Sequence, residues 1–163
     1  MAEDPDEFVG MYETVTPAAK AALDRVIRGG IQDLAVADGL VIGIYRNFGL
    51  AGTFAAVVYW TGAMLDVLLP FGPGSGMWAS GWGDGQRGII DTDLLSPHQR
   101  ALQFFVSARI NGDEDTMTAV METVLSEGPE SFGEFIAVTL NGCASTIRRF
   151  APQGPSTPGE DAR

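Results

Sequence analysis

The sequence predicts an all-α protein: a bundle of five to six helices, built as two helical-hairpin halves that a long loop rich in glycine and tryptophan joins. Apolar residues recur at helical spacing over most of residues 16–150. No stretch alternates between apolar and polar residues for long enough to form a strand. Short connections at 111–113 and 128–129 indicate that the last helices are antiparallel neighbours.

The chain of 163 residues has the length of one domain. Residues 1–15 hold five acids and no base, which predicts a flexible acidic segment. Residues 16–150 form the predicted helical domain, with the loop at 70–95. The composition of residues 151–163 is typical of a disordered tail.

Helix signals begin at Thr16, a good N-cap, and at Pro17, which suits a first helical position. An apolar stripe continues past Gly29-Gly30, so residues 16–48 form either two helices or one helix weakened at these glycines. Gly49 is a suitable stop for this part of the chain.

Residues 50–69 form a strongly apolar helix that Pro70 closes, and residues 47–65 carry no charge. A helix that is apolar all round is typical of the centre of a bundle. Tyr59 and Trp60 lie in the middle of the run instead of at its ends, which favours this interpretation over a membrane span. A membrane-associated hairpin over residues 31–69 is the alternative.

The second half opens with a capping box, because Ser96 precedes Gln99 by three residues and Pro97 occupies the first helical position. The following helix ends at Asn111-Gly112, and Asp113 caps the next one. A turn at Gly128-Pro129 leads into the most regular stripe of the chain, made of Phe132, Phe135, Ile136, Leu140, Cys143, Ile147 and Phe150.

The loop contains a G-x-G-x-x-G match at Gly83, Gly85 and Gly88. A dinucleotide fingerprint needs a strand before the glycines and a helix after them, and neither is predicted here. The one lysine, Lys20, lies far from the loop, so there is no phosphate-binding P-loop. No nucleotide cofactor is therefore expected.

One histidine and one cysteine cannot build a Cys/His zinc site. Asn111, Asp113, Asp115 and Glu122 echo the spacing of an EF-hand loop, but Thr116 stands where that loop needs glycine. Acids at a helix N-terminus explain the pattern better, and no metal or other cofactor is predicted.

No catalytic set is predicted either. Ser75, Ser80 and Ser96 lack a nucleophile-elbow motif, and the one imidazole, His98, lies in the first turn of a helix beside its cap. The lone Cys143 falls on an apolar stripe and reads as a small core residue. A single cysteine and the lack of a secretory signal favour a cytoplasmic location, and the excess of arginine over lysine is common in bacterial proteins.

The net charge of −11 argues against nucleic acid as a partner, because phosphates would be repelled. Between Arg109 and Arg148 there is no basic residue, and an acidic face is expected that either is plainly solvated or docks a basic partner. Its residues are Asp113, Glu114, Asp115, Glu122, Glu127, Glu130 and Glu134.

Three functional hypotheses follow. The preferred one is an acidic, non-enzymatic helical module for protein interaction or assembly, with self-association included. The second is an enzyme or small-ligand binder with a pocket between helices under the 70–95 loop, and the third is the membrane hairpin. The binding candidates are Trp78, Trp82, Asp84, Asp91, Asp93, His98 and Asp66. Asp38 and Asp66 each interrupt an apolar helix, which indicates a helix edge, a structural ion pair or a polar pocket.

Overall fold

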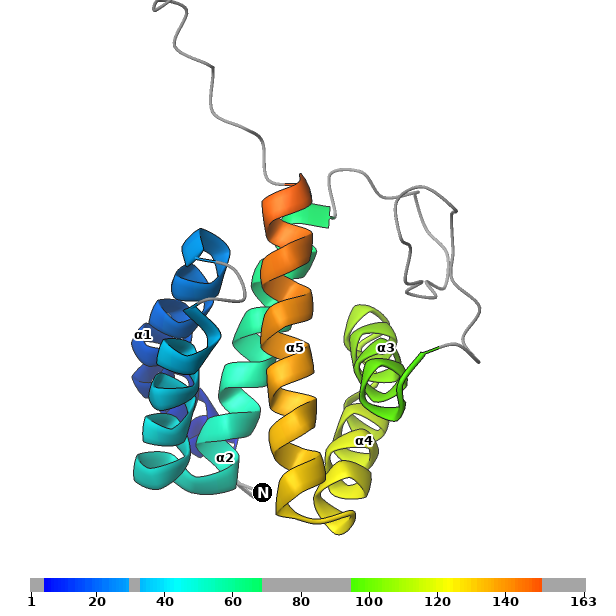
Figure 1. Ribbon diagram of the computed structural model, residues 1–163. Coiled ribbons are helices and arrows are strands. Elements are labelled where there is room, and N and C mark those ends of the chain that lie inside the picture. The colour runs from blue at the N-terminus through cyan, green and yellow to red at the C-terminus, as the bar shows by residue number, and fades with distance from the viewer. Residues whose placement is uncertain (1–4, 30–32, 69–94, 151–163) are drawn as a thin grey trace, which may run out of the picture.

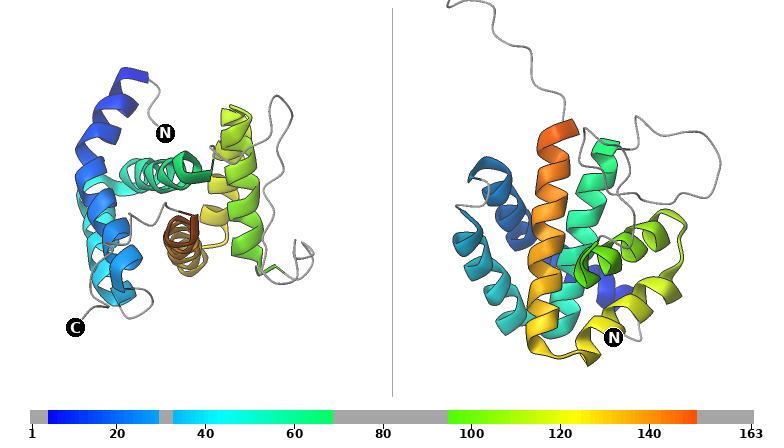
Figure 2. Two further views of the ribbon diagram at one scale, coloured as in Figure 1. Left: turned by 90° about the horizontal axis from the view of Figure 1, so that it is seen from above. Right: turned by 45° about the vertical axis from the view of Figure 1, so that its right-hand side comes forward.

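The computed structural model describes residues 5–29, 33–68 and 95–150, and every element in these ranges is a helix (Figure 1). The helices are α1 (Pro5–Gly29), α2 (Leu34–Leu68), α3 (Pro97–Ile110), α4 (Glu114–Ser126) and α5 (Pro129–Phe150). α1 pairs with α2, and α3 pairs with α4. α5 lies between the two pairs and packs against all four other helices (Figures 1 and 2). The predicted all-α bundle is confirmed.

The first helix begins earlier than the sequence suggested. α1 starts at Pro5, so residues 5–15 are helical and the predicted start at Thr16 is wrong. The Thr16 hydroxyl donates to the Tyr12 carbonyl at 2.7 Å instead of capping a helix, and Pro17 lies inside the helix. Packing explains the difference, because Val15 is fully buried and the Phe8 ring lies 5.8 Å from the Phe54 ring.

α2 consists of two helical segments, 34–48 and 50–68, that meet at Gly49. The backbone at Gly49 has φ 63° and ψ −152°, a conformation that is essentially restricted to glycine. The two segments run in nearly opposite directions (Figure 1). The predicted stop at Gly49 is therefore confirmed, and α1 ends at Gly29, as the two-helix interpretation of the Gly29-Gly30 pair required.

The second segment of α2 is the central helix of the first half. Its buried residues include Ala55, Ala56, Val57, Val58, Trp60 and Thr61. The indole Nε1 of Trp60 donates to the Ala19 carbonyl of α1 at 2.8 Å. By length and composition, the stretch Ala35–Leu68 alone among the described helices could cross a membrane. The turn at Gly49 divides that stretch into two shorter pieces.

The predicted capping signals of the second half are confirmed. The Ser96 hydroxyl accepts from the Gln99 amide at 3.2 Å, and the Gln99 side chain accepts from the Ser96 amide at 2.9 Å. The Asp113 carboxylate caps α4 by accepting from the Thr116 amide at 2.9 Å. Gly112 and Gly128 take positive φ values of 68° and 113° in the two connections. These caps and turns set α3, α4 and α5 side by side.

The core joins the two halves. The largest fully buried side chains include Trp60 of α2, Phe105 of α3 and Phe135 of α5. The Phe54 and Phe105 rings meet edge to face with centroids 6.0 Å apart, so α2 and α3 share an aromatic contact across the bundle.

Candidate functional site

The predicted binding residues fall into two groups. Asp66 and His98 are described, whereas the five loop residues lie outside the described ranges. Those five are Trp78, Trp82, Asp84, Asp91 and Asp93. Asp66 is exposed on α2, and so is Asp38, so both carboxylates lie at helix edges.

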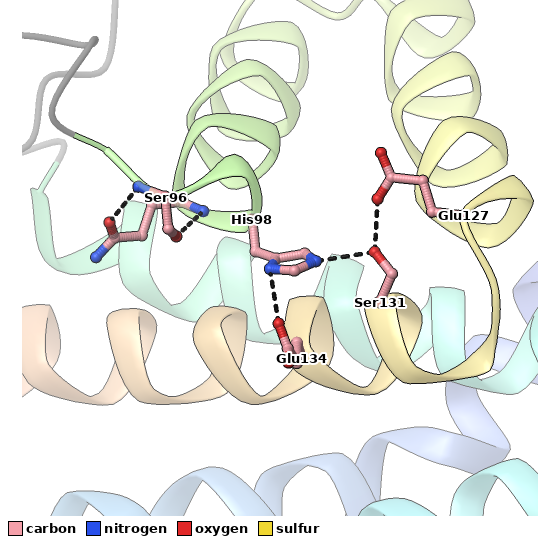
Figure 3. A network of polar contacts seen from close by, with 6 residues as sticks. Ser96, His98, Glu127, Ser131 and Glu134 are labelled. Carbon is pink, nitrogen blue, oxygen red and sulfur yellow. Dashed lines mark hydrogen bonds and ion pairs between the residues drawn. The ribbon is translucent and has the colours of Figure 1, made fainter.

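His98 lies at the centre of a polar cluster that joins three helices (Figure 3). Its Nε2 lies 2.9 Å from the Ser131 hydroxyl of α5, and its Nδ1 lies 3.2 Å from Glu134 Oε2 on the same helix. The Ser131 hydroxyl donates to Glu127 Oε2, at the C-cap of α4, at 2.6 Å. The His98 side chain is only 14% exposed.

The distances resemble those between a serine, an imidazole and a carboxylate in a nucleophilic triad. The direction of the hydrogen bond from Ser131 to Glu127 opposes a nucleophilic role for Ser131. A serine hydroxyl carries one proton, and Ser131 donates it to Glu127, so the hydroxyl accepts from His98 Nε2 instead of being activated by it. The Glu127 carboxylate beside the hydroxyl would also repel the oxyanion of an acyl-transfer transition state. The cluster is best suited to hold α3 against α5 and the end of α4.

Ser131 gives this cluster a direct test. Replacing Ser131 with alanine removes the contacts to both His98 and Glu127, and we expect the free energy of unfolding to fall by about 1–2 kcal/mol. Urea denaturation followed by circular dichroism measures this change. The matched control is Ser126→Ala, because Ser126 makes only a local bond to the Thr123 carbonyl. Equal stability of both variants and the unchanged chain would show that the polar cluster around His98 does not stabilise the fold.

A second polar feature lies between α2 and α3. The Arg109 guanidinium reaches over Gly62, where an added Cβ would come within 2.8 Å of Nη2. Burial lowers the pKa of Arg109, while Tyr12, Asp66 and Cys143 oppose this shift. Asp66 therefore stabilises Arg109 from the exposed edge of α2 without a direct ion pair among the described residues.

Cys143 is fully buried on α5, and burial raises the pKa of its thiol to about 12. Because the thiolate is the reactive form, we expect Cys143 to resist Ellman's reagent in the folded protein and to react rapidly in denaturant. The rate of thiol release measures both states. Stoichiometric labelling within seconds under native conditions would contradict the buried position.

The seven acids of the predicted acidic face lie on α4 and at the start of α5. All seven predicted acids are exposed, and none pairs with a lysine or arginine among the described residues. Three of the acids have local roles, because Asp113 caps α4, Glu127 accepts from the Ser131 hydroxyl and Glu134 pairs with His98. Hydrogen bonds from Thr116 lower the pKa of Asp113. Within the described chain, no group of three or more His, Cys, Asp or Glu side chains could hold a metal ion.

The EF-hand-like spacing of residues 111–122 is explained by the start of helix α4. The Asp113 carboxylate is occupied by the Thr116 amide at 2.9 Å and the Thr116 hydroxyl at 2.6 Å. Residues 114–126 continue as helix α4 instead of wrapping around an ion.

Comparisons with known proteins do not assign this chain to a family. No family model, no curated protein and no solved structure matches this chain.

Proposed function

We propose that this protein is a non-enzymatic interaction module that docks a basic protein partner. Its docking surface, named here the acidic face, consists of Asp113, Glu114, Asp115 and Glu122 on α4, with Glu127, Glu130 and Glu134 where α4 passes into α5. The observation that supports the proposal is that all seven carboxylates of α4 and the start of α5 are exposed and have no lysine or arginine partner in the described chain.

Unpaired charge of one sign on a rigid surface attracts a partner of the opposite sign from a distance and speeds its association. α4 and the start of α5 provide such a rigid surface, because both helices are capped or closed by defined turns. The sign of the charge favours a basic protein segment over nucleic acid. Binding through this face needs no catalytic nucleophile. Ser131, the serine that contacts His98, donates its proton to Glu127 and is not activated as a nucleophile.

The proposal is tested with a fluorescent decalysine peptide as probe and the full chain in solution. We expect the double variant Glu114→Gln/Glu122→Gln to weaken peptide binding about fivefold at physiological salt, the size expected for the loss of two exposed charge pairs. Fluorescence anisotropy measures the dissociation constant, and the difference should shrink as salt screens the charges.

The matched control changes net charge equally at another place. Glu13→Gln/Asp66→Asn neutralises two exposed acids on α1 and α2, away from the acidic face. A specific face predicts that this control binds almost as well as the unchanged chain. If the two double variants weaken binding equally, the peptide senses only total charge and the acidic face is not a docking site.

A further inference from the structure

The first segment of α2 presents an unusually apolar face to solvent. Of the seven large hydrophobic side chains that are exposed among the described residues, three lie on this segment. They are Val36, Ile42 and Tyr45, each 49–51% exposed. The segment lies at the edge of the bundle, on the side away from α3 and α4 (Figures 1 and 2). This patch is therefore separate from the acidic face.

The middle of this patch is formed by Ala35, Gly39, Ile42 and Arg46. Their spacing of four, three and four residues places them along one side of the helix, and all four are exposed. Ala37 and Ile44, on the other side, are buried in the core. A Cβ added at Gly39 would meet nothing within 4 Å, so a partner's side chain has room to approach the backbone there.

When a second copy is placed antiparallel to the first, the two surfaces match each other in side-chain size and in charge. In that arrangement Ile42 of each copy faces the open position at Gly39 of the other. Arg46 of each copy then comes within reach of Asp38 of the other, at both ends of the contact. Within one chain these two charges lie about 12 Å apart along the helix, and neither makes an ion pair among the described residues.

We propose that the 34–48 segment of α2 is a self-association surface that pairs two copies of this chain through a two-fold axis. Such a contact uses the same patch on both copies and closes on itself, so it gives dimers and not filaments. A negatively charged bilayer fits the patch less well, because a lipid-binding helix carries an excess of basic residues, whereas this segment holds one arginine and one aspartate.

The test measures the mass of the full chain over a range of concentrations by sedimentation equilibrium. We expect a concentration-dependent dimer, and Ile42→Lys should raise the dimer dissociation constant about tenfold or more, as for a charge placed in an interface core. Phe104→Lys is the matched control, because Phe104 is 58% exposed on α3 and should leave dimerisation unchanged. Circular dichroism checks that each variant is folded.

Charge exchange identifies the partner surface. Asp38→Arg and Arg46→Asp should each weaken the dimer, because each places two like charges together, and the double variant should restore it by reversing both pairs. The proposal is overturned by a monomer at every concentration. It is equally overturned by a dimer that Ile42→Lys does not weaken, or by a double variant that binds no better than the single ones.

Discussion

Trp60→Ala should lower the free energy of unfolding by about 3–5 kcal/mol, the range measured when a buried tryptophan is truncated. The indole is fully buried on the second segment of α2, and it also joins α2 to α1 through the 2.8 Å bond from Nε1 to the Ala19 carbonyl. Truncation leaves a cavity between helices that a single flexible side chain cannot fill. Urea denaturation monitored at 222 nm gives the change directly.

Trp60→Phe separates packing from hydrogen bonding, because the ring remains and the Nε1 donor is lost. We expect this variant to lose roughly 1–2 kcal/mol, much less than the alanine variant. The exposed Phe104→Ala serves as control and should stay within about 0.5 kcal/mol of the unchanged chain. A cost below about 1 kcal/mol for Trp60→Ala would mean that this residue does not hold α2 against α1.

Gly49→Ala should lower the free energy of unfolding by about 1–3 kcal/mol, because φ 63° and ψ −152° are strained for any residue with a Cβ. An added Cβ would meet no atom within 4 Å, so the cost comes from backbone conformation and not from a clash. Thermal and urea denaturation of the variant measure the loss.

Gly133→Ala is the matched control for the turn. Gly133 lies in the helical backbone of α5 and also has nothing within 4 Å of an added Cβ. There alanine should stabilise the protein by about 0.5–1 kcal/mol, since it favours helix. Effects of opposite sign at two equally open glycines would locate the turn of α2 at Gly49. A neutral or stabilising Gly49→Ala would show that the chain passes this point as ordinary helix.

The helices of the second half were predictable because their signals are local. Ser96 and Gln99 lie three residues apart, and the stripe on α5 repeats every three or four residues, so no distant contact is needed to read them. The start of α1 was not predictable from Pro17 in the same way. Packing of Phe8 and Val15 against the rest of the bundle outweighs the preference of proline for a first helical position.

The polar cluster shows the limit of a single sequence. His98 was a candidate from its residue type and its place in the first turn of a helix, but Ser131, its partner, is 33 residues away and carries no motif. Their meeting depends on how the α3–α4 hairpin returns the chain to the start of α5, which local spacing does not specify. The exposure of the seven acids between residues 113 and 134 agrees with the sequence pattern, because a run of acids without basic neighbours usually lies at the surface.

The position of α5 has a consequence for synthesis of the chain. Every other helix packs against α5, yet α5 is the last helix of the described chain to leave the ribosome. Until it emerges, the apolar sides of α1, α2, α3 and α4 that it covers have no partner within the nascent protein. Exposed apolar surface of this kind makes folding intermediates prone to aggregate. The bundle is therefore completed only after residue 150 has left the ribosome.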